Sequence, residues 1–206
     1  MSVSDARVLS RDAAMTPVSD TKGHEVTICA PNWFDPRKTY RIANAPERTA
    51  ALEFPGSDLN FAARILYAEA SGSGQLPDKS ERDKEKAAIL NVKHFRINRR
   101  GYPNNAYVAK NFEMVCKAKD QFESFSDTNT KFAGSKEGAA ARLSKVECAD
   151  LEEALEAIRK FFETGPTEEY TFDNFRGYRP GGQGTPIGRS RFWLSKTGKE
   201  LLKKQP

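Results

Sequence analysis

Apolar residues recur every three or four positions between Asp58 and Gly72, the spacing that places them on one face of an α-helix. The repeat comprises Leu59, Ala62, Ala63, Leu66 and Ala70. Ser57 or Asp58 stands at its start and is a suitable N-cap. Gly72 follows the repeat and tolerates the left-handed backbone that often ends a helix. The pattern predicts a short amphipathic helix that stops at Gly72.

A glutamate, Glu69, falls in the last turn of this predicted helix. The negative end of the helix macrodipole disfavours a charged carboxylate there and favours the protonated form. A carboxylic acid that stays protonated near neutral pH is suited to general acid catalysis. The competing interpretation is a solvent-facing glutamate at a frayed helix end.

Three further helices are expected. The first runs from Ser80 to about residue 96, and the charges of its first turns predict a solvated surface. A shorter helix spans about residues 108–115, with Cys116 near its end. The third begins at a cap at Asp150 and ends at Gly165-Pro166. Its buried stripe is Leu151, Ala154, Leu155, Ile158 and Phe162.

Extended structure is expected in two places, residues 24–30 and 169–175, where apolar and polar residues alternate. Residues 176–194 are rich in glycine and arginine. They are interpreted either as a flexible surface loop or as a mobile basic wall of a substrate cleft. The predicted fold class is mainly α, an α+β domain with a small β or extended region. We divide the chain into four parts: a flexible arm (1–22), an irregular extension packed on the domain (23–56), the main domain (57–195) and a basic tail (196–206).

Composition narrows the chemistry only slightly. The chain has 206 residues and a formal net charge of +5, which suits a polyanionic partner without choosing one. Cys29, Cys116 and Cys148 have no metal-like spacing, and there are only two histidines, so neither a metal nor another cofactor is expected. Whether two of the cysteines pair stays open. No apolar run is long enough for a membrane span.

Several short motifs follow one another in a characteristic order. They are Tyr67, Glu69, Ala70 and Gly72; Leu90, Asn91 and Val92; Pro103 and Asn104; Gln121, Phe122 and Ser124; Pro166 and Thr167; and Asn174. This order, over residues 58–180, resembles the cell wall hydrolase family that includes the spore-cortex-lytic enzymes. One departure is Ser73, which stands where that family usually has a second glutamate.

The resemblance implies a lysozyme-like, lytic-transglycosylase-like helical domain that cleaves the MurNAc–GlcNAc glycan strand of peptidoglycan. Glu69 is then the catalytic acid and base. Because no partner carboxylate is evident near Glu69, lytic transglycosylase chemistry is favoured over a muramidase reaction. The implied sugar-binding residues are Gln121, Ser124 and Asn174 through hydrogen bonds, and Tyr102 and Tyr178 through stacking. Arg176 would meet carboxylates of the peptide stem.

Peptidoglycan lies outside the cytoplasmic membrane, whereas the N-terminal residues lack the apolar core of a signal peptide. We therefore expect synthesis in the cytoplasm and export by a non-Sec route to the periplasm of a target cell. An antibacterial effector of a type VI secretion system fits this expectation, as does release by phage lysis. A secretion-machine component and a cognate immunity protein would be its partners, and neither nucleic acid binding nor membrane insertion is expected.

Two other functions stay open at this stage. A Cys-dependent peptidoglycan amidase or peptidase would pair Cys116 or Cys29 with His94. A non-enzymatic nucleic-acid-binding module would use the net positive charge and the Arg, Gly and aromatic residues of 175–193.

Overall fold

The computed structural model describes residues 16–19, 25–28, 30–43, 53–97, 99, 102–104, 107–118, 121–122, 124–125, 129–135, 143–167 and 169–203. Thr16–Ser19 (β1), inside the predicted arm, pairs antiparallel with Glu25–Ile28 (β2). The latter confirms the strand expected near residue 25. The rest of the arm and Cys29 lie outside the described residues.

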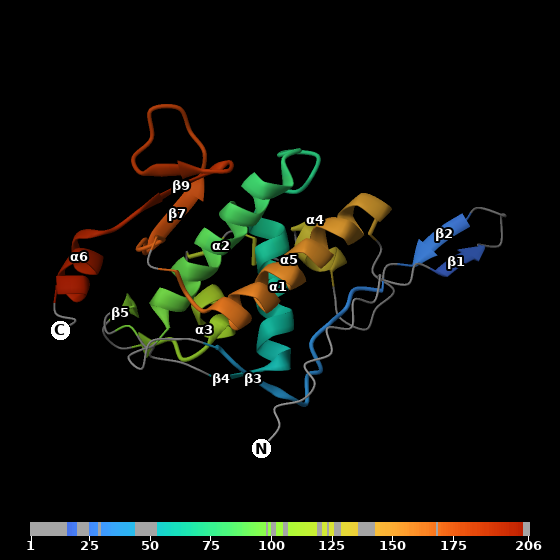
Figure 1. The fold of residues 1–206 in the computed structure, drawn as a ribbon, viewed down its shortest axis with the longest axis horizontal. Helices are drawn as coiled ribbons and strands as arrows, with labels where there is room; N and C mark the ends of the chain where they lie inside the picture. Colours follow the sequence, from blue (N-terminus) through green and yellow to red (C-terminus); the bar gives the residue numbers. More distant parts are fainter. Residues whose placement is uncertain are drawn as a thin grey trace, which may run out of the picture.

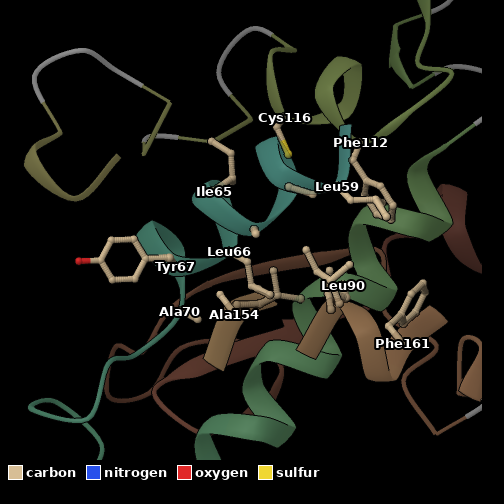
Figure 2. Packing of buried hydrophobic residues seen from close by; sticks show 14 of the residues in the cluster. Leu59, Ile65, Leu66, Tyr67, Ala70, Leu90, Phe112, Cys116, Ala154 and Phe161 are labelled. Atoms are coloured by element: carbon tan, nitrogen blue, oxygen red, sulfur yellow. The ribbon is translucent and has the colours of Figure 1, made fainter. Parts of the chain in front are cut away.

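One helix, α1 (Gly56–Glu69), lies at the centre of the fold (Figure 1). It contacts α2 (Lys79–Arg96), α3 (Phe112–Cys116), α4 (Thr130–Gly134) and α5 (Lys145–Thr164). Leu59, Ala62, Ala63 and Leu66 are fully buried, as their spacing predicts. Figure 2 shows Tyr67 on the side of α1 away from Leu90, and Tyr67 is buried too. Burial on several sides fixes α1 within the core and thereby places the residue at its end.

The ends of α1 differ from the expectation. Pro55 occupies the N-cap position without a side-chain bond, and Asp58 instead accepts hydrogen bonds from the start of α3. The helix stops at Glu69, because Ala70 has extended backbone. Gly72 is needed for space rather than for a left-handed turn. A Cβ there would lie 2.3 Å from Asp150 Oδ2.

The other long helices also begin earlier than predicted. Asp78 caps α2 by accepting from the N–H groups of Ser80 and Glu81. Ser144 caps α5 in a capping box with Glu147, so Asp150 lies inside the helix. The C-terminal end of α5 is as expected, with Gly165 at a φ of 78°. In both helices the cap lies before the residue at which the sequence pattern placed the start, because the N-cap is the residue whose backbone is still extended.

Residues 174–193 contain three strands of an antiparallel sheet; its first strand overlaps the end of the extended segment expected at 169–175, and the other two lie where a flexible loop or a mobile basic wall was expected. Asn174–Gly177 (β7), Thr185–Ile187 (β8) and Ser190–Trp193 (β9) pair in the order β7-β9-β8, and α2 contacts both β7 and β8. Gly184 makes the close packing possible, because its φ is 106° and a Cβ there would lie 2.5 Å from the Phe192 carbonyl oxygen. Lys196–Lys203 (α6), in the predicted tail, follows the sheet.

Two smaller hairpins complete the description. Thr39–Arg41 (β3) pairs with Glu53–Pro55 (β4), and Pro103–Asn104 (β5) pairs with Tyr107–Val108 (β6), both antiparallel. Helices and separate antiparallel sheets define an α+β fold. Within the described ranges, no helix is long and apolar enough to cross a membrane.

Candidate active site

Glu69 is the last residue of α1, and its side chain is partly exposed between the buried residues Tyr67 and Ala70. The chain leaves the helix directly after it, although the Ala70 N–H still bonds to the Leu66 carbonyl oxygen at 2.9 Å. A buried helix thus carries one partly exposed carboxylate to the edge of the core.

Ser124 anchors one oxygen of this carboxylate. Its backbone N–H lies 3.2 Å from Glu69 Oε1, and its hydroxyl donates a second hydrogen bond to the same oxygen. Ser124 itself is buried. Among the described residues, no hydrogen bond is made to Glu69 Oε2. One oxygen is therefore fixed and the other is open, an arrangement suited to proton transfer with a bound ligand.

Two buried carboxylates that the sequence analysis missed hold the loop after Glu69. Glu85 is 1% exposed; its Oε2 accepts from the Ser71 N–H at 3.0 Å and its Oε1 from the Ser190 hydroxyl at 2.6 Å. Asp150, also buried, accepts from the Ser73 N–H at 2.9 Å. These bonds fix the end of α1 from two sides. Both carboxylates are buried, and Glu85 is bonded through both of its oxygens and Asp150 through Oδ1, so both hold the loop in place.

The first turns of α2 are solvated on one face, where Lys79 and Lys84 are exposed, but other charged residues of these turns face the core, contrary to the expectation. Arg82, Glu85 and Lys86 are buried. Glu153 of α5 accepts from Arg82 at 2.6 and 2.9 Å and from Lys86 at 3.1 Å. One helical stripe, in which successive members are three or four residues apart or adjacent, faces the core and contains positions 82, 85, 86, 89 and 93. That register was the signal in the sequence for buried charge.

Lys93 lies on the same stripe and is fully buried, at 0% exposure. Its ammonium has no hydrogen-bond partner among the described residues and lies 5.3 Å from the centre of the Phe122 ring. Burial lowers the pKa of Lys93; Cys116 and Glu69 oppose this effect, and Arg96 adds to it. A buried amine thus lies within electrostatic reach of Glu69.

Arg96 brings three predicted binding residues together. It donates to the Tyr102 hydroxyl at 3.2 Å and to Asn174 Oδ1 at 3.1 Å. The Tyr102 hydroxyl donates in turn to Gln121 Oε1 at 3.1 Å. Asn174 is held from its other side too, because its amide donates to the buried Asp173 at 2.7 Å. Tyr102, Gln121 and Asn174 therefore form one connected polar group although they lie far apart in sequence.

Tyr102 does not have the role that the sequence suggested. It is only 8% exposed, and the Arg96 guanidinium lies 4.9 Å from the centre of its ring. The ring is therefore not available to stack on a sugar. Tyr102 supports the orientation of Gln121, whose side chain is exposed.

Arg176 and Tyr178 lie on and just beyond β7, both exposed. The Arg176 guanidinium lies 5.6 Å from the Trp193 ring centre, and Arg191 lies 4.8 Å from that of Tyr178. Arg176 shares its strand face with Asn174, since side chains alternate along a strand. Both residues follow Asn174 in the chain and are exposed, and none of the described contacts joins them to Glu69.

The cysteines do not form a catalytic pair within the described residues. Cys116 is free and buried at the end of α3, and burial raises the pKa of its thiol to about 11. A thiol that stays protonated is a poor nucleophile. His94 packs edge-on against Phe54 and Phe161 in the core. Cys148 is disulfide-bonded. In the same part of the chain, no group of three or more His, Cys, Asp or Glu side chains is arranged to hold a metal ion.

No protein-family model, curated protein or solved structure matches this chain. The function therefore has to be inferred from the chemistry of the site.

Proposed function

We propose that this protein cleaves the MurNAc–GlcNAc glycan strand of peptidoglycan, with Glu69 as the catalytic acid and base. The observation that carries the proposal is the Glu69 carboxyl group at the end of a buried helix, with Oε1 anchored by Ser124 and Oε2 unbonded within the described residues. The exposed Gln121 side chain is held by the Tyr102 hydroxyl and is one of the sugar-binding residues in this proposal.

The reaction that fits a single open carboxyl group is that of a lytic transglycosylase. Glu69 donates its proton to the bridging oxygen as the bond from C1 of MurNAc to that oxygen breaks. The 6-hydroxyl of the same MurNAc then attacks C1, and Glu69 takes the hydroxyl proton. The products are a free 4-hydroxyl on GlcNAc and a 1,6-anhydro MurNAc end. No water is consumed, and Glu69 returns to its protonated form.

The surroundings of Glu69 favour this reaction over a muramidase reaction. A hydrolase that inverts or retains the sugar configuration needs a second carboxylate at the scissile bond. The buried carboxylates of the neighbouring loop, Glu85 and Asp150, are bound to Ser71, Ser190 and Ser73. Their hydrogen bonds give them a structural role, and no other described carboxylate is joined to Glu69 or its loop, so we assign the proton transfers to Glu69 alone.

A lysozyme-like fold is part of the proposal. The support for it is a central helix that ends in the proposed acid, four helices around it and a three-stranded antiparallel sheet beside α2 (Figure 1). The order of the motifs from Tyr67 to Asn174, which resembles that of the cell wall hydrolase family, also supports this fold.

We place the site of action in the periplasm of a target cell, reached as an effector of a type VI secretion system with a cognate immunity protein. The disulfide at Cys148 supports an oxidising compartment, where such bonds persist. Expression in a Gram-negative host with and without an added periplasmic leader tests this. Lysis only with the leader is expected; equal toxicity, or none in either case, contradicts the proposal.

The reaction itself is tested by mass spectrometry of the muropeptides released from purified peptidoglycan. Wild type is expected to release anhydro ends, and Glu69→Gln is expected to release none, because the amide cannot donate or accept the proton. Glu81→Gln is the matched control, because Glu81 is a surface carboxylate paired with Lys84 on α2. Reducing ends would indicate a muramidase, cut peptides an amidase, and undiminished release by Glu69→Gln would exclude Glu69.

A further inference from the structure

Three phenylalanine rings form a compact cluster beside the Glu69–Ser124 pair. Phe61 of α1, Phe125 and Phe132 of α4 have ring centres 5.7, 5.9 and 5.4 Å apart for the pairs 61–125, 61–132 and 125–132. Phe132 is buried and Phe61 partly so, whereas Phe125 is 39% exposed. The cluster is thus a rigid base that presents one ring to solvent.

The exposed ring is tied closely to the proposed active site. Phe125 directly follows Ser124, so its Cα lies about 3.8 Å from that of the residue that anchors Glu69. The buried Ser124 and the two rings behind Phe125 limit how far that ring can move. Its position relative to the carboxylate is therefore set by packing.

Cations border the same cluster. The Lys117 ammonium lies 5.4 Å from the centre of Phe61 and 5.7 Å from that of Phe125. The Arg64 guanidinium lies 4.1 Å from the centre of Phe132 and donates to its carbonyl oxygen at 2.9 Å. Arg64 faces the buried ring, whereas the side chain of Lys117 is 46% exposed and pairs with Glu113 of α3, which holds its ammonium beside Phe125.

From this arrangement we infer that Phe125 is a stacking platform for one pyranose ring of the glycan strand, with Lys117 donating to oxygen atoms of the same sugar. A scattered exposed apolar residue needs no explanation. Phe125 differs because it is backed by two rings, bordered by an ammonium and adjacent to the Glu69 anchor. An aromatic face with a few polar groups at its edge is the usual composition of a small-molecule site.

The choice of an N-acetylated sugar as the occupant rests on the proposed function, because the glycan strand is the substrate proposed for Glu69 and Phe125 adjoins its anchor, Ser124. The inference replaces the stacking role expected for Tyr102, whose ring is buried. It also names a residue that lies on the opposite side of Ser124 from Gln121 in sequence, so the two flank the anchor.

Binding is measured in the Glu69→Gln protein by calorimetric titration with a tetramer of N-acetylglucosamine, and by sedimentation with purified peptidoglycan. Phe125→Ala is expected to weaken binding about tenfold, the usual scale for one aromatic contact. Phe125→Trp is expected to keep the affinity. Val146→Ala, which shortens another exposed apolar side chain, is the matched control and should bind as the parent does.

Circular dichroism and thermal melts establish that each variant is folded. If Phe125→Ala does not fold, the test relies on Phe125→Trp, which must keep the affinity of the parent. Unchanged affinity of Phe125→Ala, equal losses in Val146→Ala, or no binding of the parent to either glycan would overturn the inference. Cleavage by wild type is read separately. Loss of binding in Phe125→Ala without any cleavage by wild type would retain the platform and reject the proposed reaction.

Discussion

Ser124 donates two hydrogen bonds to one oxygen of Glu69, and the two residues are 55 positions apart in the chain. The pair joins the end of α1 to a segment that follows α3. This contact holds the proposed acid in one orientation, and it exists only because the core brings both segments together.

The first prediction concerns this contact. Ser124→Ala removes the hydroxyl donor and leaves the backbone donor, so Glu69 loses part of its orientation. The rate constant kcat for release of anhydro muropeptides should fall about ten- to a hundredfold, because the negative charge that develops on Glu69 as its proton leaves loses a hydrogen bond. The KM should change little. Ser80→Ala, at an exposed serine of α2, is the control; an undiminished kcat in Ser124→Ala would mean that the hydroxyl is dispensable.

A second prediction concerns the buried amine of Lys93. Lys93→Met keeps much of the side-chain volume and removes a buried amine without a hydrogen-bond partner among the described residues. The free energy of unfolding should rise by about 1–3 kcal/mol at neutral pH, because the cost of burying that group disappears. Denaturant titration measures this. A variant less stable than wild type would show that Lys93 stabilises the fold.

The pH dependence of the same variant has a definite sign. The pKa of Lys93 is lowered from 10.5 in the folded protein, chiefly by burial. Between the lowered pKa and 10.5, the unfolded chain binds one more proton than the folded chain, so this residue makes stability rise with pH. The advantage of Lys93→Met over wild type should therefore shrink as pH increases across that window.

The third prediction concerns Asp58, whose carboxylate accepts from the N–H groups of Phe112 at 3.1 Å and Glu113 at 2.7 Å. Burial raises the pKa of Asp58 to about 6, although these two bonds oppose the shift. The stability contributed by this raised pKa is fully present below 3.8 and is lost as pH rises through about 6.

Asp58→Asn removes the titration and one of the two acceptors. It should destabilise the protein by about 1–3 kcal/mol, because one backbone donor of α3 is left without its partner. The stability difference between wild type and variant should be largest below pH 3.8 and decline through pH 6. Parallel unfolding curves at pH 4, 5, 6 and 7 check this, and a constant difference would refute the raised pKa.

The fourth prediction concerns Glu153, which neutralises two buried cations of α2. Glu153→Gln leaves Arg82 and Lys86 without their counter-charge, and their side chains are 6% and 2% exposed. A loss of about 3–5 kcal/mol is expected, typical of breaking a buried ion pair. Glu156→Gln, at an exposed position of the same helix, should cost far less. Thermal and denaturant unfolding compare the two, and similar values would show that the ion pairs contribute little.

Several features were determined by the sequence alone. The apolar repeats of residues 59–66 and 151–162 specify two helices and their buried faces, because a helix side chain meets neighbours three and four residues away. Gly165 ends α5 as its freedom of backbone rotation predicts. Glu69 is recognisable as the carboxylate in the last turn.

Tertiary structure decided which polar group meets which. Asp58 and Asp150 look like helix caps in the sequence, yet each bonds to a distant backbone N–H. Glu85 and Lys93 look solvated, yet their helix register turns them inward. Residues 174–193 pair as a sheet, although their glycines and arginines suggest a loop. The bonding partners of Asp58 and Asp150 lie tens of residues away in the chain. The charged face of α2 is buried by other elements of the fold. Local spacing can indicate which face of a helix is buried, but it does not identify a partner distant in the chain, and the Glu69–Ser124 pair is the clearest example.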